Sequence, residues 1–99
     1  MQCKSKNDFE NILRMKEIAD IYNATGQYGK SKKYHETIID ICEKHPKNEK
    51  MLIMKINSLN HLKKSYKSLE TTNELLNLNP YNIDALINIA NHIKETEHV

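Results

Sequence analysis

NPYNIDALINIANHI, residues 79–93, is the stretch of sequence that decides the fold. Its proline ends an apolar segment, and apolar residues then return at intervals of three and four, as one face of an α-helix requires. EKHPKNEKML, residues 43–52, repeats the order of proline, asparagine and apolar residues 34 positions earlier. Pairs at that separation are Pro46 and Pro80, Asn48 and Asn82, Leu52 and Leu86, Ile53 and Ile87, Asn57 and Asn91, and Asn23 and Asn57. A period of this length predicts stacked helix–turn–helix units.

The same apolar pattern divides the chain into five predicted helices, separated by breaks at Gly26 and Gly29, at Pro46, between residues 62 and 66, and at Pro80. The predicted helices span 8–25, 31–45, 48–62, 66–78 and 82–96. Asp8 is expected to cap the first of them with its carboxylate. Residues 1–7 are expected to form a disordered tail. A chain of 99 residues has room for one domain, here 8–96.

Residues 79–93, together with ELLNLNP at 74–80, resemble the tetratricopeptide repeat (TPR) family, whose units have this length. The resemblance covers residues 15–95, about two and a half repeats. It implies an all-α superhelix, a solenoid of antiparallel helix hairpins. A small residue is expected where first helices cross closely, as at Ala90, but Tyr22 and Ile56 stand at that position in the earlier repeats. The second helices carry Tyr34 and Ser68 at the position where the family favours a small residue. The large aromatic usual in the first helices is replaced by Ile18, Leu52 and Leu86, so a more general HEAT-like helical hairpin remains open.

In TPR proteins the first helices of successive repeats line a concave groove that holds ligands, so the resemblance implies a site for a peptide or partner protein. The expected groove residues are Asn23, Ile53, Met54, Asn57, Asn60, His61, Ile87, Asn88, Asn91 and Lys94. An asparagine amide both donates and accepts hydrogen bonds, which suits the backbone of an extended peptide. Asn23, Asn57 and Asn91 share one repeat position and are expected to form a ladder. The same residues also fit ordinary solvated positions and core packing.

Chaperone-binding TPR domains hold a terminal carboxylate with lysine, asparagine and arginine at set groove positions. The matching positions here hold Ala19, Asn23, Met54, Asp84 and Asn88. Only Asn23 agrees, and Asp84 would repel a carboxylate. A carboxylate clamp is therefore not predicted.

Two alternative functions are compatible with the sequence. Lysines gather at the first turn and at the equivalent second turn, and could form a basic ridge for an acidic protein or a nucleic-acid backbone: Lys30, Lys32, Lys33, Lys63, Lys64 and Lys67. The net charge of +2 and a pI near 8.5 do not demand such a partner. The other alternative is self-assembly through the ends of the array. Against this alternative, the last helix is expected to shield the apolar end of the array, because a terminal unit needs a polar outer face, which Lys94, Glu95, Glu97 and His98 are expected to supply.

Catalytic and cofactor-binding patterns are missing from the sequence. It contains no glycine-rich phosphate loop, no H-E-x-x-H and no G-x-S-x-G. Cys42 and His45 form a C-x-x-H pair without the second pair that a structural zinc site needs, so Cys42 is predicted to be a core residue. No stretch approaches the roughly 18 apolar residues of a membrane span. We therefore expect a non-enzymatic cytoplasmic protein without cofactor, metal or membrane contact, a monomer or weakly self-associating.

Overall fold

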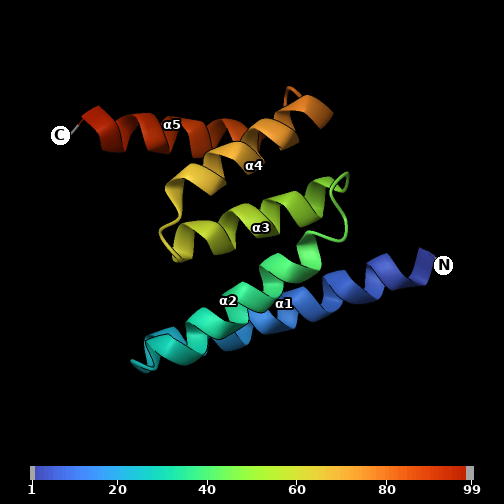
Figure 1. Ribbon diagram of the computed structural model, residues 1–99, viewed down its shortest axis with the longest axis vertical. Coiled ribbons are helices and arrows are strands. Elements are labelled where there is room, and N and C mark those ends of the chain that lie inside the picture. The colour runs from blue at the N-terminus through green and yellow to red at the C-terminus, as the bar shows by residue number, and fades with distance from the viewer. Residues whose placement is uncertain (1, 98–99) are drawn as a thin grey trace.

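The computed structural model describes residues 2–97 of the chain, with side chains from 7 to 95 (Figure 1). These residues form five helices and no strand: α1 (Gln2–Ala24), α2 (Tyr28–Cys42), α3 (Glu49–His61), α4 (Ser65–Leu78) and α5 (Ile83–Glu97). The all-α prediction is confirmed. Successive helices run antiparallel in one row, with α1 and α5 at its opposite ends (Figure 1). The row is flat, measuring 37 × 37 × 17 Å.

Helix α1 begins earlier than predicted. The helix already includes Gln2, whereas the sequence suggested a tail over 1–7 and a cap at Asp8; Met1 lies outside the described residues. No glycine or proline interrupts residues 2–24, so nothing in the sequence stops the helix from extending. Asp8 lies inside the helix, and its Oδ2 is 2.8 Å from Nε2 of His45. Its carboxylate therefore ties α1 to the loop after α2 instead of capping a helix.

The turns after α1 and α3 are built alike. Each contains one residue with positive φ, Gly26 at 80° and Lys63 at 59°. Each closes with the hydrogen-bond pair of a Schellman motif: Gln27 N to Tyr22 O and Gly26 N to Asn23 O, then Lys64 N to Leu59 O and Lys63 N to Asn60 O. Lysine in this conformation costs about 1–2 kcal/mol that glycine avoids. Gly29, expected in the turn, lies in α2, which therefore begins at Tyr28 instead of Ser31.

The starts of α3 and α5 are also equivalent to each other. Oδ1 of Asn48 accepts from Met51 N at 3.2 Å, and Oδ1 of Asn82 accepts from Ala85 N at 3.0 Å. These two N-caps are 34 residues apart, but the turns at Gly26 and Lys63 are 37 apart. The first unit thus has three more residues between its two turns than the second. The 34-residue period therefore holds at the starts of α3 and α5, but it fails at the turns that follow α1 and α3.

Because the turns are 37 residues apart, equivalent positions on α2 and α4 are also 37 residues apart and not 34. The buried face of α2 includes Ser31, His35 and Ile38, and the buried face of α4 includes the residues 37 later: Ser68, Thr72 and Leu75. The small residue matching Ser68 is therefore Ser31. The 37-residue correspondence therefore pairs Ser68 with Ser31 and not with Tyr34, which had put a bulky side chain where a small one is expected.

The core consists of two apolar clusters that meet at α3. Met51 and Met54 pack with Ile12 of α1 and Ile38 of α2 in the first cluster, which also contains Cys42. On the other face of α3, Leu52 and Ile56 pack with Leu75 of α4 and Ala85 of α5. Because α3 buries both faces, it is the central helix of the row.

The outer face of α5 is apolar, which contradicts the expected polar cap. Ile83, Leu86 and Ile93 are exposed, and so is Ala90, which was expected at a close helix crossing. The reason is the rotation of α5 about its axis: Ala85 and Asn88 face the rest of the protein, so Ala90 points away. Among the expected polar residues, Lys94 and Glu95 are exposed, while the side chain of Glu97 and all of His98 lie outside the described part.

Candidate functional site

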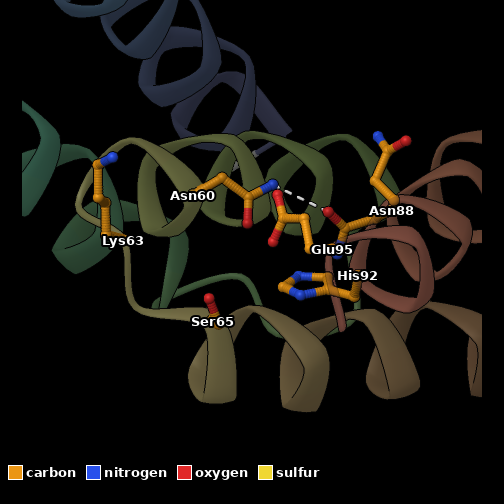
Figure 2. A pocket seen from close by; sticks show the side chains of 7 residues that line it. Asn60, Lys63, Ser65, Asn88, His92 and Glu95 are labelled. Atoms are coloured by element: carbon orange, nitrogen blue, oxygen red, sulfur yellow. Dashed lines mark hydrogen bonds between the residues drawn. The ribbon is translucent and has the colours of Figure 1, made fainter. Parts of the chain in front are cut away.

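Two adjoining hollows lie along α3 and α5. The first, of about 150 Å³, is lined by Ile53, Ile56, Asn57, Asn60, Asp84, Ile87, Asn88 and Asn91. The second, of about 290 Å³, is lined by Asn60, Lys63, Ser65, Asn88, Asn91, His92 and Glu95 (Figure 2). Asn60, Asn88 and Asn91 belong to both hollows, which we together call the asparagine groove.

A hydrogen-bonded network fixes the floor of this groove. Asn88 is buried, and its Nδ2 donates to Thr72 Oγ1 at 2.7 Å and to Ser68 Oγ at 3.1 Å. Its Oδ1 accepts from Asn60 Nδ2 at 2.9 Å, as Figure 2 shows. Ser68 Oγ donates to Asn60 Oδ1 at 2.7 Å, and Thr72 Oγ1 donates to the Ser68 carbonyl at 2.7 Å. Both amides are therefore engaged within the protein, and they shape the groove without being free to bind a ligand.

The groups left for a ligand form a repeated pair. Asn57 and Asn91 are exposed, and each lies one helical turn after an isoleucine, Ile53 on α3 and Ile87 on α5. Each helix thus presents one apolar side chain and one free amide at positions 34 residues apart. Asp84 adds a negative charge to the same hollow. The surface suits a neutral or basic chain with apolar side chains and exposed backbone groups, and it disfavours an anion.

Of the expected groove residues, six line the groove: Ile53, Asn57, Asn60, Ile87, Asn88 and Asn91. Met54 does not, because it is buried in the core cluster between α3 and the α1–α2 pair. Lys94 is exposed but lines neither hollow. Asn23 and His61 line another hollow, so the expected asparagine ladder is broken. At the 37-residue spacing the residue equivalent to Asn23 is Asn60. The main-chain carbonyl of each accepts from the backbone N–H of the positive-φ residue in its turn, Gly26 or Lys63.

The sequence did not identify several residues that line the groove: Ile56, Lys63, Ser65, His92 and Glu95. Asp84, which the comparison with a carboxylate clamp placed at a groove position, lines the first hollow. Lys63 and Ser65 come from the turn between α3 and α4. Their place at the groove depends on how that turn packs, and no sequence pattern signals it.

A third hollow, of about 540 Å³, lies where the end of α1, the start of α2 and the end of α3 meet. It is lined by Asn23, Tyr28, Ser31, Lys32, His35, His61, Leu62, Lys63 and Lys64, and we call it the histidine–lysine hollow. The rings of His35 and His61 stack with centroids 4.5 Å apart. His35 is buried, and its Nδ1 is 3.0 Å from Ser58 Oγ. Burial lowers the pKa of His35, and the nearby charge of His61 lowers it further.

The lysine ridge expected from the sequence is assembled in part. Lys32, Lys63 and Lys64 line the histidine–lysine hollow. Lys30 instead has its Nζ 5.4 Å from the centre of the Tyr22 ring, and Lys67 lines a separate hollow together with glutamates. The described residues that line the histidine–lysine hollow include three lysines and no acidic side chain.

Cys42 is a core residue, as the sequence indicated. It is fully buried, and burial raises the pKa of its thiol to about 12. Within the described part of the chain, no three histidine, cysteine, aspartate or glutamate side chains gather so as to hold a metal ion. Within the same residues, no helix combines the length and the apolar character needed to cross a membrane.

No family model, curated protein or solved structure matches this chain. Two surfaces of the described structure bear on function, the asparagine groove and the histidine–lysine hollow. The first offers amides beside apolar side chains, and the second offers cations beside two imidazoles.

Proposed function

We propose that the protein is a non-catalytic interaction module, a TPR-like solenoid that binds an extended peptide segment of a partner protein in the asparagine groove. The observation that carries this proposal is the repeated pair of Ile53 with Asn57 and Ile87 with Asn91 along one surface. A free amide can pair with the peptide backbone of any sequence. The adjacent isoleucine would take an apolar side chain of the same ligand, with Asp84 selecting against acidic ones.

The rigid floor supports this proposal. Asn60 and Asn88 are held by bonds to Ser68 and Thr72, so the groove does not have to order itself when a ligand binds. Preorganised surfaces spend less of their interaction free energy on ordering side chains. The asparagine groove is therefore suited to a ligand that contributes few contacts, such as a short linear segment.

The test is to select peptides from a displayed random library on the full chain and to measure binding of the selected peptide by fluorescence anisotropy. Replacing Asn57 and Asn91 together by alanine should weaken binding roughly tenfold to thirtyfold, because about two hydrogen bonds of about 1 kcal/mol each are lost. The matched control replaces Asn73 and Asn77, two exposed asparagines of α4. The groove proposal fails if the library yields no peptide, or if the control weakens binding as much as the groove variant does.

The histidine–lysine hollow carries a second candidate function, binding of an acidic protein segment or a nucleic-acid backbone. The observation favouring it is that Lys32, Lys63 and Lys64 line one concavity. Binding to phosphates would weaken steeply with salt because counterions are released. Retention on heparin at low salt, lost when Lys32 and Lys64 become glutamate but kept when the exposed Lys44 and Lys47 do, would support it. Absence of retention would rule it out.

A further inference from the structure

The histidine–lysine hollow has the size of a small-molecule site. Its volume of about 540 Å³ exceeds those of the two hollows of the asparagine groove, about 290 and 150 Å³. Pockets that hold small ligands usually measure about 300–1,000 Å³. One side of α2 forms a wall of the hollow, because the lining residues Tyr28, Ser31, Lys32 and His35 lie at helical spacing. The ends of α1 and α3 complete the concavity.

One group of lining side chains is aromatic. The rings of His35 and His61 are stacked, with centroids 4.5 Å apart and 13° between their planes. His35 is buried, and burial together with the charge of His61 lowers its pKa, so its ring is uncharged at neutral pH. Tyr28 is 67% exposed, so most of its surface is uncovered by the protein. Aromatic surface of this kind inside a hollow suits a flat ring of a ligand, which stacks on other rings.

The other group is cationic. It contains three lysines: Lys32, Lys63 and Lys64. The chain has no aspartate or glutamate over residues 21–35 or 50–69, the two segments that supply every lining residue. Asp20 precedes the first segment, but it does not line the hollow, and its Oδ2 is 3.4 Å from Nζ of Lys16. A phosphate monoester, with a charge of about −1.5 to −2 at neutral pH, matches several lysines better than a single carboxylate does.

Lys63 lines the hollow from a backbone conformation that disfavours a side chain. Its φ is 59°, whereas the equivalent turn after α1 has Gly26 at 80°. A left-handed conformation costs free energy in lysine that glycine avoids. The turn itself therefore does not require a lysine, and strain of this kind is often kept at ligand sites.

We propose that the histidine–lysine hollow binds a small molecule that joins an aromatic ring to a phosphate group, as a nucleoside monophosphate does. The ring lies against Tyr28 and the two stacked imidazoles, and the phosphate lies among the three lysines. Inorganic phosphate would leave the rings unused, and an uncharged ring would leave the lysines unused. This inference rests neither on peptide binding in the asparagine groove nor on the second candidate function, which needs the lysines alone.

Isothermal titration calorimetry of the full chain with adenosine monophosphate (AMP) tests the proposal. AMP should bind at least roughly tenfold more tightly than inorganic phosphate or adenosine, because only AMP combines stacking with charge pairing. Phenyl phosphate shows the source of the ring: affinity equal to that of AMP supports any aromatic phosphate, and lower affinity supports a nucleoside phosphate. The proposal is overturned if neither compound binds at millimolar concentration, or if adenosine or inorganic phosphate binds as tightly as AMP.

Neighbouring residues provide matched controls for the site. Lys32→Ala should weaken AMP binding roughly tenfold, whereas Lys33→Ala, which alters an exposed lysine outside the hollow, should not. Tyr28→Ala should weaken binding of AMP but not of inorganic phosphate. Tyr66→Ala, at an exposed tyrosine near the start of α4, should leave both unchanged. Equal effects of the two lysine variants, or of the two tyrosine variants, would place the ligand outside the hollow and refute the assignment.

Lys63→Gly separates binding from folding. Glycine relieves the left-handed conformation, so the urea midpoint should rise, while AMP binding should weaken severalfold because a cation is lost. A more stable variant that binds AMP as tightly as the wild type would contradict the role of Lys63. Heparin distinguishes this proposal from the second candidate function. Heparin retention without AMP binding refutes the small-molecule site alone, and AMP binding without heparin retention refutes only the second candidate.

Discussion

Replacing Asn88 by alanine should destabilise the protein through the network beneath the groove. Three hydrogen bonds are removed, to Thr72, Ser68 and Asn60. Ser68 and Thr72 still donate to other acceptors, so the substitution leaves no buried hydroxyl donor unpaired. At a net value near 1 kcal/mol for each bond, the expected loss is about 2–3 kcal/mol. That loss corresponds to a fall in Tm of roughly 10–20 °C for a domain of this size.

Urea unfolding followed by circular dichroism measures this difference, and Asn91→Ala is the matched control. Asn91 is an asparagine on the same helix, but it is exposed, so its variant should stay within about 0.5 kcal/mol of the wild type. Asn88→Met tests the reasoning further, since Met54 occupies the corresponding position of the preceding unit. Methionine is larger than asparagine and leaves no cavity, so it should cost less than alanine. If Asn88→Ala and Asn91→Ala have equal effects, the network does not stabilise the fold.

The remaining predictions concern the turns, a histidine and the cysteine. Gly26→Ala should destabilise the protein by about 1 kcal/mol because φ is positive there. Gly29→Ala, inside α2 with open space around it, should stabilise the protein by about 0.5–1 kcal/mol. If urea unfolding gives the same sign for both variants, the turn assignment is contradicted. The lowered pKa of His35 means that the unfolded chain binds more protons, so stability should be full above pH ~6.5 and fall below it. His35→Gln should flatten that dependence between pH ~7.5 and ~5.5, and an unchanged slope would show that another group causes it. Burial raises the pKa of Cys42 to about 12, so maleimide should label this thiol in urea but not in the native protein. Mass spectrometry locates the labelled residue, and rapid labelling of Cys42 in the native protein would refute its burial.

Local signals in the sequence were sufficient to locate α3, α4 and α5, but α1 and α2 begin earlier than predicted. Pro46 and Pro80 each follow a helix, and Asn48 and Asn82 each begin the next, because proline breaks helices and asparagine caps them whatever the surroundings. The repeated Ile and Asn of the groove were found by the same spacing. These features depend on residues close together in the chain.

Features that depend on packing were missed. The 34-residue period, measured at the proline junctions, was carried over to a junction where the spacing is 37, and this misplaced Asn23 and Tyr34. Apolar periodicity showed that the helix containing Met54 has two apolar sides, but not which of them meets the preceding hairpin. Nor could it show that Ala85 and Asn88, instead of Ala90, would face inward on the last helix.

The row arrangement has a consequence for folding. Each helix packs mainly on the helices adjacent to it in the chain, so contacting residues are close in sequence and the contact order is low. We expect rapid folding that starts from one helix pair and spreads along the row. Local unfolding of the native protein should also depend on the position of a helix in the row. Amide protons of α3, covered on both faces, should exchange last, and those of α5, which packs on α4 at the end of the row, should exchange while the rest stays protected.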